Sequence, residues 1–279
     1  MFADRAVAYR DVGDAPGRQT LLLIPGLGGA MSFWGRAVEM LVRDYRVVSF
    51  DHPGVSGSAD PVAPTSVKML AQLSVALLDY LQIDRAVYVG HSMGGIIAQT
   101  SAVTYPQRVS ALVLSSTWLR ADHYFHKAFA QRRWMLENAG ADIYARAQTL
   151  SVLPPEYIAN NPRTVDAQEQ RAAAAFRDPA IVCQRIAALL AFDGSAQLAQ
   201  IRQPVLVVYC EGDSVVPPHM SRLLSRELRA CAQQSASAHT GDVQELALTG
   251  GGHFSPLVIP EEFVAAVLGF LGFCHERSL

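Results

Sequence analysis

The chain has 279 residues, half of them hydrophobic, so it is long enough to bury a large core in one domain, alone or with an insertion. Its 23 basic and 25 acidic residues leave a formal net charge of −2. Without a block of like charge, the sequence lacks the electrostatic signature of a protein that binds nucleic acid or an anionic membrane. We therefore expect a globular protein whose partner is a small molecule.

The N-terminal segment lacks the basic start and apolar run of a secretory signal, and no apolar stretch is long enough to span a bilayer. These features favour a cytoplasmic protein, and the sequence leaves a monomer and a homodimer open. The four cysteines are scattered without CxxC or CxH spacing, so we expect neither a zinc site nor a disulfide framework. No metal or other cofactor is predicted.

Short apolar runs alternate with longer helical segments, a pattern typical of parallel strands joined by crossover helices. The runs expected to form strands are Thr20 to Ile24, Tyr45 to Phe50, Ala86 to Val89, Val109 to Leu114, Val205 to Tyr209 and Val243 to Leu248. The segments expected to form helices between and after them are Ser66 to Leu81, Met93 to Tyr105, Pro218 to Ala230 and Glu261 to Phe273.

The strand rhythm stops between Trp118 and Gln203, where alanine-, arginine- and glutamine-rich segments take over. Pro-Pro, Asn-Pro and Asp-Pro steps divide this stretch, because proline in a helix interior loses a hydrogen bond and clashes with the preceding turn. We therefore expect residues 118–203 to form a cap of several short helices. The core would then consist of residues 1–117 and 204–279.

The motif GHSMGG at residues 90–95 directly follows a predicted strand and precedes a predicted helix. A serine at such a turn is held in a strained conformation with its hydroxyl exposed, and the nearby glycines remove side chains that would collide. The following helix presents unpaired amides and a positive partial charge to a reacting carbonyl oxygen. We predict that Ser92 is a nucleophile for acyl transfer.

A serine hydroxyl needs a general base at neutral pH, and histidine has a suitable pKa. His253 follows three glycines after the last predicted strand, at the sheet edge where doubly wound proteins place their sites; a surface-loop histidine is the alternative. Asp213, which follows another strand, is the predicted carboxylate partner of the base, with Glu211 and Asp51 as rivals. The chain order of Ser92, Asp213 and His253 is that of hydrolases with this serine turn.

Acyl transfer also needs two preorganised hydrogen-bond donors where negative charge develops on the carbonyl oxygen. The backbone N–H of Met93, directly after the serine, is the first predicted donor. The second is the N–H of Leu27 in the glycine-rich turn PGLGG at residues 25–29. This turn lacks the G-x-G-x-x-G and Walker lysine patterns, so nucleotide binding is not expected.

The segments PGLGG, DHPGVSGS, GHSMGG, GDSVVP and GGGHFSPLVIPEEF together resemble the α/β-hydrolase fold family over nearly the whole chain. The resemblance implies an eight-stranded, mostly parallel sheet with helices on both faces and a helical cap inserted between core strands. It places the family's catalytic triad on Ser92, Asp213 and His253, and its oxyanion donors on Leu27 and Met93. Many members have His-Gly at the oxyanion turn; this chain has Pro-Gly, which leaves the backbone donors intact.

Serine at the motif argues against the epoxide hydrolases and haloalkane dehalogenases of the family, which place aspartate there. The cap segment from STWLRADHYF to LPPEYI is similar to that of the bacterial aminoacrylate hydrolase of pyrimidine breakdown and, more loosely, to the 3-oxoadipate enol-lactonases. Those relatives imply a small, carboxylate-bearing catabolic intermediate as substrate.

The side chains that flank the motifs are predicted to line the substrate pocket, with core packing as the alternative for each: Phe33, Trp34, Trp118, Arg120, Arg132 and Phe254. Residues 120–133 contain four basic side chains against one acidic side chain. This excess favours an anionic substrate, although a solvated helix face is the alternative.

The leading hypothesis is hydrolysis of a small ester, lactone or enol-lactone through an acyl-enzyme on Ser92. Cleavage of a C–C bond in a β-diketone and hydrolysis of an amide or enamine remain open, because they would use the same triad. A ligand-binding protein without hydrolytic activity and a cofactor-free oxygenase or lyase are alternatives from other classes.

Overall fold

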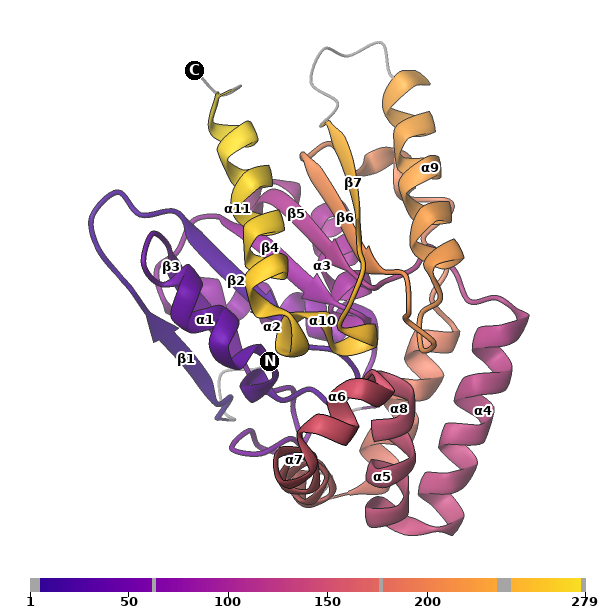
Figure 1. The fold of residues 1–279 in the computed structure, drawn as a ribbon. Helices are drawn as coiled ribbons and strands as arrows, with labels where there is room; N and C mark the ends of the chain where they lie inside the picture. The colour runs from indigo at the N-terminus through magenta and orange to yellow at the C-terminus, as the bar shows by residue number, and fades with distance from the viewer. Residues whose placement is uncertain (1–5, 62–63, 176–177, 235–241, 277–279) are drawn as a thin grey trace.

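The computed structural model describes residues 6–61, 64–175, 178–234 and 242–276 (Figure 1). In this part of the chain seven strands form one sheet in the order β1-β3-β2-β4-β5-β6-β7. Only the edge strand β1 is antiparallel to its neighbour. The strands are β1 (Tyr9–Val12), β2 (Thr20–Ile24), β3 (Arg46–Phe50), β4 (Ala86–His91), β5 (Val109–Ser115), β6 (Val205–Cys210) and β7 (Val243–Leu248).

The expected mostly parallel sheet and all six predicted strands are confirmed, but two details differ from the sequence-based expectation. The described residues form seven strands where the family resemblance implied eight. Strand β1 has the sequence YRDV, which is half polar and partly exposed, because it pairs on only one side at the sheet edge. It therefore lacks the buried apolar run that reveals the central strands.

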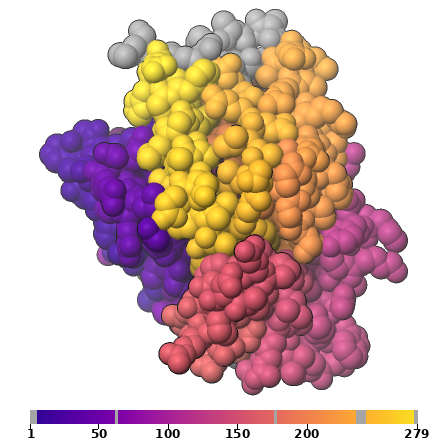
Figure 2. Space-filling model, in the orientation of Figure 1, coloured from indigo at the N-terminus to yellow at the C-terminus, as the bar shows by residue number. Residues whose placement is uncertain are grey.

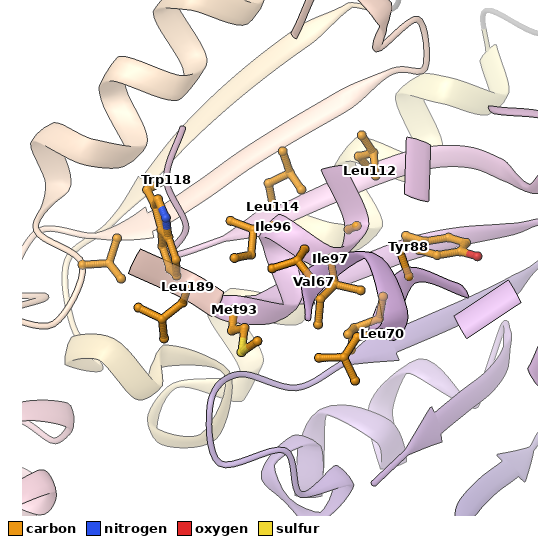
Figure 3. Packing of buried hydrophobic residues seen from close by; sticks show 14 of the residues in the cluster. Val67, Leu70, Tyr88, Met93, Ile96, Ile97, Leu112, Leu114, Trp118 and Leu189 are labelled. Carbon is orange, nitrogen blue, oxygen red and sulfur yellow. The ribbon is translucent and has the colours of Figure 1, made fainter. Parts of the chain in front are cut away.

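Helices cover both faces of the sheet because alternate residues of each central strand point to opposite sides. Leu21 and Leu23 of β2 belong to one buried cluster, together with residues of α1 (Gly35–Leu41) and α11 (Pro260–Glu276). Leu22 and Ile24 belong to the opposite cluster, part of which Figure 3 shows. That cluster includes α2 (Val67–Tyr80), α3 (Met93–Thr104) and α9 (Pro218–Gln234).

A group of helices lies between β5 and β6 in the chain and below the sheet in Figure 1. We call them the cap helices: α4 (His123–Asn138), α5 (Gly140–Val152), α6 (Pro155–Asn160), α7 (Pro162–Ala175) and α8 (Pro179–Leu190). Asp122 and Asp178 cap α4 and α8 by accepting hydrogen bonds from backbone amides, and proline occupies the first turn of α6 and α8. The cap forms a lobe directly beneath the core in the space-filling view (Figure 2).

Short helical turns complete the described structure: η1 (Met31–Trp34), η2 (Pro106–Arg108), η3 (Leu198–Gln200), η4 (Gly252–Phe254) and α10 (Ser255–Val258). No single described helix is long and apolar enough to cross a membrane. One bent pair, Gly252–Val258 with Pro260–Glu276, meets that test only when the two parts are taken together across a bend of 85°.

Candidate active site

Ser92 lies on the turn between β4 and α3 and has a backbone φ of 55° and ψ of −118°. This conformation is costly for a residue with a side chain, so the surroundings must hold it in place. The Ser92 amide donates to the carbonyl of Ser115 at 2.8 Å, and the Ser92 carbonyl accepts from Thr117 Oγ1 at 2.9 Å. Hydrogen bonds to the end of β5 and the segment after it therefore fix the serine at the carboxyl edge of the sheet.

Two glycines of the motif allow backbone segments to approach closely around Ser92. A β-carbon added to Gly90 would lie 2.2 Å from the carbonyl oxygen of Gly94, and one added to Gly94 would lie 2.0 Å from that of Ile24. Both distances are far below van der Waals contact and involve rigid backbone. The glycine spacing therefore has a direct steric reason: α3 starts against the ends of β2 and β4.

His253 and Asp213 form a buried pair beside this turn. His253 Nδ1 lies 2.7 Å from Asp213 Oδ2. The other carboxylate oxygen accepts from the amides of Val215 and Val216 at 2.8 and 2.9 Å. Because a carboxylate accepts, Nδ1 carries the proton in this pair, and Nε2 is the nitrogen that remains to exchange a proton.

The turn at residues 25–29 lies against Ser92. A β-carbon added to Gly26 would be 3.2 Å from Ser92 Cβ, and the amide of Gly29 closes the turn by donating to the Gly26 carbonyl at 3.0 Å. Among the described residues, neither the Leu27 amide nor the Met93 amide finds a hydrogen-bond acceptor. The two amides predicted as oxyanion donors therefore have no acceptor among the described residues. An oxyanion hole requires such free donors.

Ser92 and His253 line the same cavity, which has a volume of about 590 Å³. Within the described part of the chain, no hydrogen bond joins the two side chains. Catalytic hydrogen bonds in unliganded enzymes are often long and tighten when substrate binds. The cavity therefore offers both groups to one ligand, with the sheet edge on one side and α4, α5 and α7 of the cap on the other.

Of the side chains predicted to line the pocket, Phe33, Arg132 and Phe254 do so. Phe33 stacks on the ring of His91, with centroids 4.7 Å apart, and meets Phe254 edge to face at 5.1 Å. The His91 ring is buried and 4.7 Å from the His253 ring. Burial, and secondarily the His253 charge, lowers the pKa of His91 well below its usual range, so His91 is neutral and packs against the His253 ring.

The other three pocket predictions are wrong for the described structure. Trp34 is fully buried and packs against Phe263 of α11, whereas Ser32 and Phe33 of the same turn, η1, line the cavity. Trp118 is also fully buried, 4.6 Å from the Phe125 ring, in the cluster that holds Met93 (Figure 3). Arg120 is exposed and donates to Ser195 Oγ at 3.0 Å, so it links the two ends of the cap segment.

Arg132 on α4 is only 7% exposed and borders the cavity. Burial lowers its pKa, while the neighbouring Tyr144 and Asp213 partly oppose that change. Its guanidinium lies 4.9 Å from the centre of the Phe129 ring. Among the described residues no carboxylate pairs with it and no acceptor bonds to it, so its donors are free for an anionic ligand.

The rival acids have other partners. Glu211 forms an ion pair with Arg222, and both side chains are close to half exposed. Asp51 accepts a hydrogen bond from the Met31 amide at 2.8 Å, which holds the chain just after the turn at residues 25–29. Neither borders the cavity. The described residues also contain no group of three or more His, Cys, Asp or Glu side chains arranged for a metal ion.

Sequence reasoning missed the cap side chains that face the cavity, notably Phe129, Tyr144 and Gln148. Their spacing differs little from that of other apolar or polar positions on α4 and α5, so the sequence holds no signal that separates them. Val215 could have been predicted to line the cavity, since it follows Asp213 by two residues within the motif GDSVVP. It borders the cavity and is 2% exposed.

Comparisons with known proteins identify the family of this chain. Residues 19–258 match the family model described as alpha/beta hydrolase fold. The chain is 32% identical over 252 residues to a protein of Azorhizobium caulinodans named as a carbamate hydrolase, RutD, covering 90% of this chain and 91% of that one. It is 35% identical over 260 residues to the RutD-named protein of Rhizobium rhizogenes, covering 92% and 94% of the two chains.

Two solved structures have the same fold. A hydrolase from Pseudomonas aeruginosa superposes with a TM-score of 0.82 at 26% identity, covering 98% of this chain and 96% of the other. The enol-lactonase from Burkholderia xenovorans superposes with a TM-score of 0.84 at 23% identity, covering 96% and 97%. With the family match spanning most of its length, the chain belongs to the α/β-hydrolase fold family and is a hydrolase.

Proposed function

We propose that the protein is a serine hydrolase that forms an acyl-enzyme on Ser92, with His253 as general base and Asp213 as its orienting carboxylate. One observation carries this proposal: the buried His253–Asp213 pair and the strained Ser92 turn open into one cavity. A buried imidazole bonded to a carboxylate on one nitrogen is suited to accept a proton on the other.

In the proposed reaction, His253 Nε2 takes the Ser92 hydroxyl proton while Oγ attacks the carbonyl carbon of the substrate. The amides of Leu27 and Met93 stabilise the oxyanion of the tetrahedral intermediate. As that intermediate collapses, His253 returns the proton to the leaving group. A water molecule, deprotonated by His253, then attacks the acyl-enzyme and releases the acid and Ser92.

For the substrate, we favour a small ester, lactone or enol-lactone that bears a carboxylate. The buried and unpaired guanidinium of Arg132 beside Tyr144 supports the carboxylate. A cavity of about 590 Å³ lies within the range of small-molecule sites. The Burkholderia enol-lactonase contributes only its fold to this proposal, because its identity to this chain is 23%.

Hydrolysis of an amide, enamine or carbamate is a second candidate on the same three residues. The relatives named as carbamate hydrolases, at 32% and 35% identity, favour it. Cleavage of a C–C bond in a β-diketone would use the same nucleophile and oxyanion donors. These reactions differ in the leaving group that His253 protonates, and the rest of that group contacts the cavity wall.

A fluorophosphonate probe tests the nucleophile. We expect intact-mass analysis to find one adduct on the wild-type protein, mapped to Ser92, and none on Ser92→Ala at equal concentration. An unlabelled wild-type protein would point instead to a ligand-binding protein or a cofactor-free lyase of the fold. A panel of p-nitrophenyl esters, enol-lactones, carbamates and β-diketones, assayed with the same two proteins, then identifies the reaction class.

A further inference from the structure

Arg185, on cap helix α8, connects three separate parts of the chain. It is 0% exposed. Its Nη1 donates to the carbonyl of Leu27 at 3.2 Å, and its Nη2 donates to the carbonyl of Pro53 in the segment after β3. One cap side chain thus holds the oxyanion turn and a neighbouring core loop together.

The guanidinium of Arg185 is buried without a compensating negative charge. No carboxylate of the described residues lies within ion-pair distance of it, and its Nε has no partner there. Burial lowers the pKa of Arg185 to about 10, so the group is still cationic at neutral pH. Burying a charge in this way is costly, and apolar residues of similar size often serve stability as well or better. The hydrogen bonds to the Leu27 and Pro53 carbonyls offset part of this cost, and they direct the cation to the turn at residues 25–29.

The oxyanion turn is held from two sides at this point. The amide of His52 donates to the carbonyl of Gly29 at 2.8 Å. A β-carbon on Gly29, whose φ is 71°, would lie 2.8 Å from His52 Cβ and 3.1 Å from Arg185 Nη1. Within the described chain, Arg185 is the donor that occupies the Leu27 carbonyl. The conformation of Leu27 therefore depends on this guanidinium.

We propose that Arg185 is a positioning residue that fixes the Leu27 amide for the oxyanion and places a positive charge behind the oxyanion hole. This inference rests on the proposed function. Holding the carbonyl of Leu27 restricts rotation of the residue and so aims its N–H at the cavity. A cation in a site of low dielectric also stabilises the charged tetrahedral intermediate more than the neutral carbonyl of the substrate. Loss of this cation should therefore lower kcat and leave KM nearly unchanged.

The test compares Arg185→Met, Arg185→Lys and wild type with p-nitrophenyl acetate as substrate and a small alkyl trifluoromethyl ketone as inhibitor. The ketone adds to an activated serine and leaves an oxyanion in the hole. For Arg185→Met we expect kcat to fall about 10- to 100-fold with KM nearly unchanged, and the Ki of the ketone to rise by a similar factor. Arg185→Lys keeps the charge and one donor, so its kcat and its Ki for the ketone should lie between those of wild type and Arg185→Met.

Arg108→Met is the matched control. Arg108 also donates to two backbone carbonyls, those of Ile83 and Asp84, but it lies at the amino end of β5, away from the cavity. We expect its kcat and ketone affinity to equal those of wild type.

Wild-type kcat and ketone affinity in both Arg185 variants would overturn the positioning role, as would a rise in KM with kcat unchanged. If Arg185→Met does not fold, the kcat, KM and ketone Ki of Arg185→Lys, compared with those of wild type, decide between these outcomes. Failure of the proposed function is distinct from either, because the wild-type protein itself would then bind neither the ketone nor a fluorophosphonate at Ser92.

Discussion

His253 Nδ1 and Asp213 Oδ2 lie 2.7 Å apart, and the two side chains are 5% and 0% exposed. In Asp213→Asn, the amide group can donate to Nδ1 and so favour the tautomer with its proton on Nε2, which cannot accept the Ser92 proton. We expect kcat to fall about 10³- to 10⁴-fold with little change in KM. Steady-state kinetics on the best ester of the substrate panel measures both.

Glu211→Gln is the control for the Asp213 substitution, since Glu211 precedes Asp213 by two residues but pairs with Arg222 at the surface. It should retain wild-type kcat. The opposite pattern, a large loss in Glu211→Gln and a small one in Asp213→Asn, would reassign the acid.

Gly94→Ala should destabilise the fold, because its β-carbon would lie 2.0 Å from the Ile24 carbonyl oxygen. Overpacking of this kind costs about 1–3 kcal/mol. Gly269→Ala, on an exposed position of α11 with nothing within 4 Å of the added β-carbon, should instead stabilise the protein by up to about 1 kcal/mol. Urea denaturation gives both free energies of unfolding, and equal stability of the two variants would contradict the close approach of α3 to β2.

Arg132→Gln should weaken binding of substrates that carry a carboxylate. A charge-assisted hydrogen bond is worth about 1.5–3 kcal/mol, so KM for an ester with a free carboxylate should rise about 10- to 100-fold. KM for the matching neutral ester should change little. Arg133→Gln is the control, because Arg133 is exposed and pairs with Glu137 at 2.8 Å. Parallel changes for both esters would remove Arg132 from carboxylate recognition.

Two buried histidines should make the fold sensitive to acid. Burial, with a smaller contribution from Arg185, lowers the pKa of His52 well below its usual range. Burial also lowers the pKa of His91 well below that range. In the unfolded chain histidine takes up a proton near pH 6.5. Below that pH the unfolded state therefore binds more protons than the folded state, and the free energy of unfolding falls as the pH falls.

For each of these histidines the expected slope is about 0.7 kcal/mol per pH unit at pH 6.5 and approaches about 1.4 kcal/mol per pH unit well below it. Urea denaturation at pH 8, 6.5 and 5.5 measures it. Between pH 6.5 and 5.5, His52→Asn should lose about 1 kcal/mol less stability than the wild-type protein. A free energy of unfolding that stays constant down to pH 5.5 would show that neither ring is held neutral by the fold.

Much of the core could be predicted because its signals are local. Central strands such as β2 are continuous apolar runs, and glycines that directly follow a predicted strand mark the positions of Ser92 and His253. Strand β1 escaped prediction for the converse reason: at the sheet edge it is half exposed, so its residues need not be apolar.

Charge counting in the cap could not separate one arginine from another. Arg120 and Arg132 looked equivalent in the sequence, yet one is exposed beside Ser195 and the other is buried at the cavity. Phe33 and Trp34 were likewise both predicted to line the pocket, yet Phe33 lies at the cavity and Trp34 lies in the core. The direction of a side chain depends on how its element is rotated against its neighbours, and several rotations satisfy one apolar pattern.

Six of the seven described strands, the serine turn and the chain order of the candidate triad are predictable from the amino-acid sequence, because strand periodicity and glycine spacing express short-range sterics. Two features appear first in the folded protein: the set of cap side chains that reach the cavity, and the hydrogen bond of Arg185 to Leu27 across 158 residues of chain. The physical reason is that helices α4, α5 and α8 acquire a buried side only by packing on one another and on the core. The partners of a buried charge follow from that packing.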